Sequence, residues 1–269
     1  MKYTEESLKI KYNELKPLFE RTCTNVKEVL TIFLKENNVP FLAVSTRVKD
    51  FSSFYLKIDR KKYCNPFNET EDFCGSRIIL YHLSDIVKVN QIIRKEFDVQ
   101  NNEDKTDKLN VNEFGYRSYH FIVKLKDKWL ETPNYRGLKG IKIEIQVRTV
   151  LMHAWAEIEH KLGYKNKDQV PKELRRKLFL ISAKLEEADG QFQELVRDIG
   201  DYQNELISKA EKKGRFTSNE FNLNTIQALL DFYFPEHEKR EYATLESLKE
   251  IRSLEIPLTK VVEYVEKLK

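Results

Sequence analysis

Strand-like and helix-like hydrophobic patterns alternate between residues 40 and 165, and this alternation limits the fold of the 269-residue chain more than any other feature. Runs rich in β-branched and aromatic residues predict strands at 40–48, 77–81, 119–126 and 139–147. Helical periodicity separates the first three runs, and turn residues near Pro133 and Gly137 separate the last two. We therefore expect an α/β (α+β) fold, with a mixed β-sheet flanked by helices.

Amphipathic helical patterns lie on both sides of this region. One covers residues 14–37, and another covers 171–199, where apolar residues recur at alternating steps of four and three. A seven-residue repeat suits contact with another helix, either within the fold, which we favour, or in a homo-oligomer. We expect four parts: an N-terminal helical segment (1–38), a core (39–168), a long helical segment packing on that core (169–213) and a helical extension (214–269).

Composition excludes several classes of protein. The three cysteines are widely spaced and have no histidine at metal-ligand spacing, which argues against a disulfide framework and a zinc site. A polar N-terminus and the absence of a run of eighteen apolar residues predict neither a signal peptide nor a membrane span. The net charge of +4 is too small for a general nucleic-acid coating protein. We expect a cytoplasmic protein whose positive field is local.

The first candidate site is a row of cations where a strand leads into a helix. Lys49, Ser53 and Lys57 are four residues apart, so they lie along one helix face close to Arg47. Such a row at a helix N-terminus suits a polyphosphate, although a solvated basic face has the same spacing. The chain contains no P-loop motif.

Two further segments place polar groups next to strands. Asp72 stands just before Gly75 and Arg77, where it could hold a divalent metal or could simply be an acid at a helix end. Tyr116 and His120 lie in a glycine- and aromatic-rich strand entrance, where an aromatic ring beside cations could stack a base. Aromatic residues are also common at the start of ordinary strands, so this segment alone does not distinguish a base-binding site from a structural strand.

The last segment alternates polar and apolar residues. Glu144, Gln146 and Arg148 share one face of the predicted strand. In the helix that follows, His153 and Glu157 have a spacing that could bind metal, but no third ligand is evident.

These four segments, in this order, resemble the synthetase domain of RelA/SpoT-type alarmone synthetases, particularly the small stand-alone members, over residues 40–165. The matching motifs are Arg47-x-Lys49-x-x-x-Ser53-x-x-x-Lys57, Asp72-x-x-Gly75-x-Arg77, Gly115-Tyr116-Arg117-Ser118-x-His120, and Glu144-x-Gln146-x-Arg148-Thr149 with Glu159-His160-Lys161. The resemblance implies a nucleotidyltransferase-like fold. It also implies a Mg²⁺-dependent transfer of pyrophosphate from ATP to the 3′-hydroxyl of GDP or GTP, with release of AMP.

The resemblance also implies a role for each matching residue. Arg47 and Arg77 would sandwich the adenine, and Lys49, Ser53 and Lys57 would hold the phosphates. Asp72 and Glu144 would bind Mg²⁺, and Glu144 would accept the proton of the attacking hydroxyl. On the acceptor side, Tyr116 would stack on guanine, with the pocket completed by His120, Gln146 and Lys105.

The sequence departs from the family pattern on the acceptor side. Relatives that make alarmones often carry a lysine three residues before the glycine, whereas this chain has Asn112 before Gly115. This difference leaves two other acceptors open, the 3′-CCA end of tRNA and adenosine nucleotides. A catalytically inactive nucleotide sensor is the alternative from a different class. The family's His-Asp hydrolase motif is absent, so we expect another protein to degrade the product.

Overall fold

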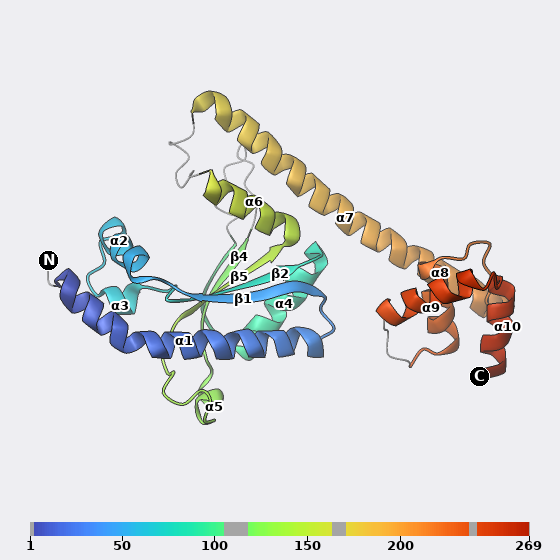
Figure 1. Cartoon of the computed structure of the whole chain (residues 1–269), viewed down its shortest axis with the longest axis horizontal. Helices are drawn as coiled ribbons and strands as arrows, with labels where there is room; N and C mark the ends of the chain where they lie inside the picture. The colour runs from blue at the N-terminus through green and yellow to red at the C-terminus, as the bar shows by residue number, and fades with distance from the viewer. Residues whose placement is uncertain (1–2, 105–117, 163–170, 237–240, 269) are drawn as a thin grey trace. The chain divides into compact units, whose positions relative to one another are not determined.

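The computed structural model describes residues 3–104, 118–162, 171–236 and 241–268. The chain forms two compact units, Met1–Gln191 and Phe192–Lys269. The predicted site residues all belong to the first unit, which contains the sheet (Figure 1).

A five-stranded mixed sheet forms the centre of the first unit. Its strands are β1 (Phe41–Val48), β2 (Cys74–Leu80), β3 (Asp98–Asp104), β4 (Tyr119–Lys124) and β5 (Ile143–Thr149), in the spatial order β1-β2-β5-β4-β3. The β2–β5 pair is parallel, and the other three pairs are antiparallel. The expected α/β fold with a mixed sheet is confirmed.

The strands differ from the sequence prediction in several respects: β2 begins three residues earlier, at Cys74, β4 ends at Lys124 rather than at residue 126, and β3 and β5 differ as follows. β3, with the sequence DVQNNED, was not predicted, because a polar strand at the edge of a sheet lacks the apolar alternation by which strands are identified. β5 begins at Ile143 rather than at residue 139, and Gly140 just before it has φ +81°, which ends the extended conformation there.

Helices cover both faces of the sheet (Figure 1). α1 (Glu5–Glu36) and α4 (Leu83–Glu96) pack against one face, and α6 (Val150–Lys161) lies over the other. α1 begins nine residues earlier than the pattern predicted, at a capping box formed by Thr4 and Ser7, and it continues through Pro17. The shorter helices are α2 (Phe51–Lys61), α3 (Pro66–Glu69) and α5 (Asp127–Leu130).

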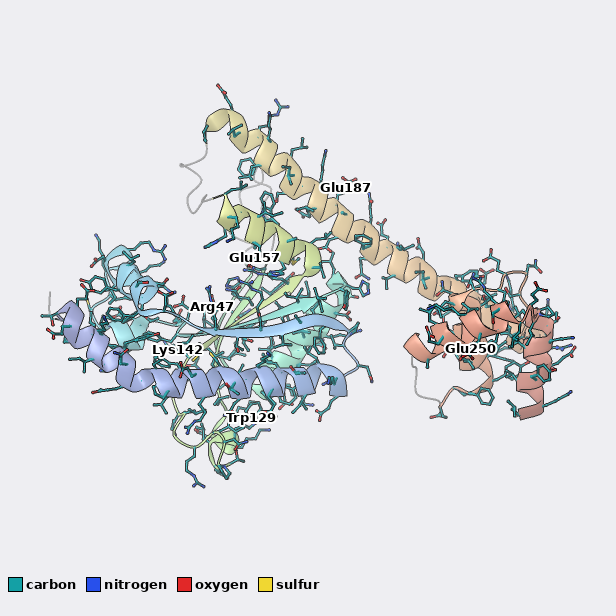
Figure 2. All side chains as sticks on the ribbon, in the orientation of Figure 1. Arg47, Trp129, Lys142, Glu157, Glu187 and Glu250 are labelled. Atoms are coloured by element: carbon teal, nitrogen blue, oxygen red, sulfur yellow. The ribbon has the colours of Figure 1, made fainter. Side chains whose placement is uncertain are left out.

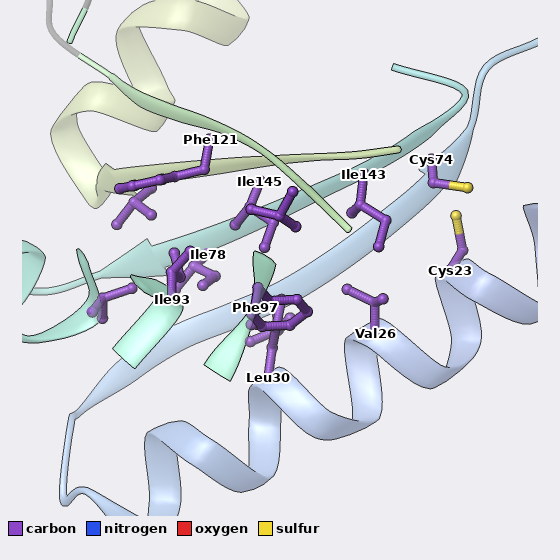
Figure 3. Packing of buried hydrophobic residues seen from close by; sticks show 14 of the residues in the cluster. Cys23, Val26, Leu30, Cys74, Ile78, Ile93, Phe97, Phe121, Ile143 and Ile145 are labelled. Carbon is purple, nitrogen blue, oxygen red and sulfur yellow. The ribbon is translucent and has the colours of Figure 1, made fainter. Parts of the chain in front are cut away.

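The core lies between the sheet and the α1–α4 layer (Figure 3). Ile143 and Ile145 of β5 are 1% and 0% exposed and meet Val26 and Leu30 of α1 within this cluster. Since neighbouring residues of a strand point to opposite faces, the polar residues between them face the α6 side. The buried face of β5 thus fixes where its polar residues lie.

Thr149 is the last residue of β5, and its side chain links that strand to α6 and to the long helix α7 (Lys172–Lys213). Its hydroxyl accepts a hydrogen bond from the Met152 amide at 3.1 Å and donates one to the buried Asp189 carboxylate at 2.5 Å.

Thr149→Val should lower the free energy of unfolding by about 2 kcal/mol, because it removes both bonds without changing the side-chain volume much. Thr149→Ser, which keeps the hydroxyl, should cost clearly less in urea unfolding; an equal loss in both variants would contradict this assignment.

The second unit has its own core. It contains the end of α7 together with α8 (Leu223–Tyr233), α9 (Glu241–Ser253) and α10 (Leu258–Leu268), packed around Phe216 and Leu229. The Tyr233 hydroxyl accepts from the Phe216 amide and donates to Glu266 Oε1 at 2.8 Å. In the part of the chain that the structure describes, no helix has the length and apolar character needed to cross a bilayer.

The apolar repeat on α7 is only partly covered. Leu178 is half-buried, whereas Ile181, Phe192 and Leu195 are more than half exposed. Self-association through this helix therefore stays a prediction.

Candidate active site

The register of the sheet brings the predicted site residues of four strands together. In β1, β2 and β5, Arg47 pairs with Gly75, and Gly75 pairs with Glu144. In the next row, Arg77 of β2 pairs with Gln146, and Gln146 pairs with His120 of β4. Residues from separate sequence motifs thus form two adjacent rows on the face that α6 overlies.

A pocket of about 260 Å³ lies over these rows. It is lined by Ser45, Thr46, Arg47, Gly75, Ser76, Arg77, Glu144, Gln146 and Glu157. Arg47 and Glu157, both labelled in Figure 2, line it from β1 and from α6. A Cβ atom at Gly75 would lie 3.5 Å from Arg47 Cγ, so the glycine leaves room beside the arginine. The two arginines and two carboxylates make this a polar, charged pocket.

Asp72, three residues before the pocket residue Gly75 in the sequence, is held by two lysines. Lys49 Nζ lies 2.9 Å from Asp72 Oδ2, and Lys57 Nζ lies 2.8 Å from Asp72 Oδ1. All three side chains are less than 20% exposed. Burial opposes ionisation of the carboxyl, but the bonds from Lys57 and Lys49 outweigh burial and lower the pKa of Asp72. The cluster is therefore ionised at neutral pH and carries one net positive charge.

A chain of hydrogen bonds fixes Glu144. The Arg148 guanidinium donates to Gln146 Oε1 at 2.8 Å, and Gln146 Nε2 donates to Glu144 Oε2 at 2.9 Å. Glu144 Oε1 lies 3.1 Å from His120 Nδ1, and His120 Nε2 lies 2.7 Å from Ser118 Oγ. A carboxylate only accepts, so Nδ1 carries the hydrogen, and the Nε2 of a neutral ring accepts from the Ser118 hydroxyl. Both oxygens of Glu144 are thus oriented.

Arg148 is a buried cation that binds Gln146, a residue of the pocket lining. It is 9% exposed, and burial together with the nearby Arg77 lowers its pKa to about 10, so it stays protonated at pH 7. Arg77 in turn contacts α6, with its Nη1 2.7 Å from Glu157 Oε1 and 3.3 Å from His153 Nδ1. Burial and Arg77 lower the pKa of His153, which is therefore largely neutral at pH 7. The predicted spacing of His153 and Glu157 serves here to hold an arginine.

The N-terminus of α2 is already capped by the protein. The Asp50 carboxylate accepts from the Ser53 amide at 2.8 Å and from the Ser52 hydroxyl at 2.5 Å. These bonds lower the pKa of Asp50. Ser53 is exposed in the first turn, one turn before Lys57. The Asp50 carboxylate already accepts the Ser53 amide at the start of α2. A phosphate bound at this helix end would therefore contact the Ser53 side chain and the nearby lysines, rather than that backbone amide.

Most of the predicted site residues lie close together in the structure, and two of them are not among the residues that the structure describes. Arg47, Arg77, Glu144 and Gln146 line the pocket, His120 touches Glu144, and Lys49 and Lys57 bind Asp72. Lys105 and Tyr116 lie outside the described residues. The sequence prediction did not include Arg148, Ser118, His153 or Glu157 among the site residues. The strand alternation did place Arg148 on the same face as Gln146, two residues earlier, but it assigned no role to the arginine.

The two predicted metal ligands both bind neighbouring side chains, Asp72 through two lysines and Glu144 through Gln146 and His120. Both carboxylates are 19% exposed, Asp72 two residues before β2 and Glu144 within β5. Among residues 3–104, 118–162, 171–236 and 241–268, no group of three or more His, Cys, Asp or Glu residues could hold a metal ion. One or two carboxylates, completed by substrate phosphates, are the donor set that Mg²⁺ commonly uses with nucleotides. The donors fit Mg²⁺ carried by a nucleotide better than a metal bound by protein alone.

Comparison with known proteins gives consistent matches. The sequence model for the "Region found in RelA / SpoT proteins" matches residues 46–169. GTP pyrophosphokinase YjbM from Bacillus subtilis (strain 168) is 31% identical over 214 residues, which cover 78% of this chain and 90% of that protein. A GTP pyrophosphokinase family protein from Streptococcus pneumoniae matches in structure with a TM-score of 0.61 and 27% identity, covering 71% of this chain and 96% of that one. Small alarmone synthetase 1 from Bacillus subtilis, bound to its product pppGpp, matches with a TM-score of 0.59 and 27% identity, covering 70% and 97%.

Proposed function

The chain belongs to the RelA/SpoT family of small alarmone synthetases, and we propose on that basis that it transfers pyrophosphate from ATP to the 3′-hydroxyl of GDP or GTP, releasing AMP. The observation that carries this proposal is the pocket in which two arginines lie beside the oriented carboxylate of Glu144. Transfer of a phosphoryl group needs mainly positioning and neutralisation of charge, and this site supplies both.

The positions of two arginines and two lysines suggest how the donor, ATP, would bind. Arg47 of β1 and Arg77 of β2 are diagonal neighbours in the sheet, because Arg47 pairs with Gly75, and the missing side chain of Gly75 leaves space beside Arg47 for a flat base. Lys49 and Lys57 are close enough to share one carboxylate, so they can also converge on the phosphates of one nucleotide. We therefore assign the adenine to the arginines and the phosphates to Lys49, Lys57 and Ser53.

The acceptor side centres on Glu144. Its carboxylate accepts bonds from Gln146 and His120, which hold both oxygens in fixed positions, as a general base requires. We propose that it takes the proton of the acceptor's 3′-hydroxyl as that oxygen attacks the β-phosphorus of ATP. The β–γ pyrophosphate then passes to the acceptor, and AMP leaves with the electrons of the broken P–O bond.

Mg²⁺ is the metal that we expect at this site, held by Asp72 and Glu144. When bound, it would supply neutralisation of the charge on the ATP phosphates. Lys49 and Lys57 both contact Asp72, so they lie where they could also contact the phosphates of a nucleotide whose Mg²⁺ this carboxylate would hold.

The deciding experiment tests donor and acceptor together. ATP labelled at the γ-phosphate is incubated with Mg²⁺ and with GDP, GTP, an adenosine nucleotide or bulk tRNA in separate reactions. We expect label in the guanine nucleotides and an equal amount of AMP. Label in tRNA or adenosine nucleotides alone would replace the proposed acceptor, and label in no acceptor at any Mg²⁺ concentration would leave a nucleotide sensor.

Tyr116 offers a test of the acceptor side. Stacking of a base on an aromatic ring contributes about 1–3 kcal/mol, so Tyr116→Ala should raise the acceptor KM by roughly one to two orders of magnitude. The KM for ATP should change little. Tyr116→Phe keeps the ring and should behave like the wild type in steady-state kinetics. Equal damage to both KM values in the alanine variant would mean that the tyrosine supports the fold instead.

A further inference from the structure

A second pocket lies at the end of the sheet where β2 and β5 begin, and it has no lining residue in common with the candidate active site. Its volume is about 430 Å³, within the usual size of small-molecule sites. It is lined by Lys11, Leu15, Phe19, Phe67, Asn68, Thr70, Phe73, Lys124, Lys139, Gly140, Ile141 and Lys142. We refer to it as the α1–α3 pocket, because α1 and α3 form two of its walls.

Aromatic and aliphatic side chains line the base of the α1–α3 pocket. Phe67 and Phe73 stack with ring centroids 5.8 Å apart and planes 16° apart, and Phe73 stacks on Phe19 at 4.6 Å. Leu15 and Ile141 are partly buried against the same core. An array of parallel rings offers a flat apolar surface to a planar group.

Four lysines surround this apolar surface. Lys142 donates to the Asn68 carbonyl at 3.0 Å and lies 3.5 Å from Glu71, and Lys139 lies 3.3 Å from Asp127 (Figure 2 labels Lys142). Within the described part of the chain, Lys124 and Lys11 form no ion pair, and the Lys11 ammonium lies 4.9 Å from the Phe67 ring centre. Among the described residues, these two lysines of the pocket therefore have no carboxylate within ion-pair distance.

Thr70 adds an unsatisfied polar group to the wall. Its side chain is 2% exposed, and its Oγ1 has no hydrogen-bond partner among the residues that the structure describes. A buried hydroxyl without a partner costs free energy, so such groups in a pocket wall commonly mark a ligand or water position. The same short segment carries Asp72 two residues later.

We propose that the α1–α3 pocket binds a small phosphate monoester that carries a flat apolar group. The planar group would lie on Phe67 and the rings behind it, and the phosphate would reach Lys124 and Lys11. A phosphate monoester carries about −1.5 to −2 charges at pH 7, which matches the two lysines without a carboxylate partner. A neutral ring compound would leave those lysines unsatisfied, and inorganic phosphate would leave the apolar surface in water.

The probe for this proposal is 4-methylumbelliferyl phosphate, titrated calorimetrically into the full chain. The nucleotide pocket is first filled with GDP and the non-hydrolysable ATP analogue AMPCPP. We expect one probe molecule to bind per chain, and 4-methylumbelliferone and inorganic phosphate each to bind at least tenfold more weakly. Binding that disappears when the nucleotides are present would place the probe in the active site and overturn the proposal.

Charge-matched variants locate the probe. Lys124→Glu should weaken probe binding at least tenfold, whereas Lys27→Glu, the same charge change at an exposed position of α1 outside the pocket, should leave it within twofold. Lys124→Met serves as a second variant if the charge reversal unfolds the protein, with thermal melting as the check. Equal weakening by Lys27→Glu and the Lys124 variants would show that only the general charge of the protein attracts the probe, and the proposal would fail.

Discussion

Glu144→Gln should reduce kcat for pyrophosphate transfer by about 10³-fold or more, while the dissociation constant for ATP stays within a few-fold. A positioned general base contributes 10²–10⁴-fold, and the same side chain would also lose its charge as a metal ligand. The amide can still accept one hydrogen bond, so the neighbouring contacts of Gln146 need not collapse. The effect should therefore fall on the transition state rather than on binding of the donor. Single-turnover kinetics with labelled ATP, together with calorimetric titration of AMPCPP, separates these two quantities.

Glu157→Gln is the matched control for this substitution. Glu157 is a carboxylate of the same pocket, but it pairs with Arg77 and is 50% exposed. Its loss should change kcat by less than tenfold and act mainly on the KM for ATP, through Arg77. If Glu144→Gln keeps near-normal turnover, the assigned proton acceptor is wrong, even though the family is not in question.

Asp72→Asn should lower kcat by about 10²- to 10³-fold. The carboxylate is the second proposed ligand of Mg²⁺, and stabilisation of transition-state charge by a metal is worth several kcal/mol. Raising the Mg²⁺ concentration should restore part of the rate, because the remaining ligands still bind the nucleotide-borne metal weakly. An Mg²⁺ titration of kcat/KM measures this, and a wild-type titration curve in the variant would remove Asp72 from the metal site.

The same substitution should destabilise the protein by an amount that depends on pH. Asp72→Asn leaves the largely buried Lys49 and Lys57 without their carboxylate, which should cost about 1–3 kcal/mol at pH 7. The pKa of Asp72 is lowered in the folded state, so its stabilising effect is fully present above the unfolded pKa of about 3.9 and is lost as pH falls through the folded value. The difference between wild type and variant should thus be equal at pH 7 and pH 5 and shrink below about pH 4 in urea unfolding. A difference that grows on acidification would contradict the ion-paired cluster.

The sheet and its polar face could largely be predicted from the sequence, because Ile143, Ile145 and Val147 alternate with Glu144 and Gln146. β3 could not be predicted, since it has almost no apolar side chain and is held by backbone bonds to β4. The sequence pattern also does not show which strands pair or in which register. The contact of His120 with Glu144, 24 residues away, depends on the register of β4 with β5.

The ion pairs of Lys49 and Lys57 could not be predicted from the sequence pattern either. Lys49 and Lys57 were predicted to lie on one helix face, where they would be free to meet phosphates. The prediction is wrong for Lys49, which lies before Asp50, the N-cap of α2, and so is not on the helix. Both lysines instead contact Asp72, which is 23 residues from Lys49 and 15 residues from Lys57 along the chain. Helical spacing specifies which side chains are neighbours on the helix, but it does not specify which carboxylate the tertiary fold brings to them.

The hydrogen bonds around Glu144 have a consequence for how such an enzyme can diverge. All four bonds from Arg148 to Ser118 join residues of β4, of β5 and of the position just before β4. Two of the predicted acceptor contacts, Lys105 and Tyr116, belong instead to the separate segment 105–117. Because the proposed proton acceptor, Glu144, is held on paired strands, substitutions in that segment could change which molecule is modified without altering the residues around Glu144. Substrate choice and reaction type would then evolve at different rates within one chain.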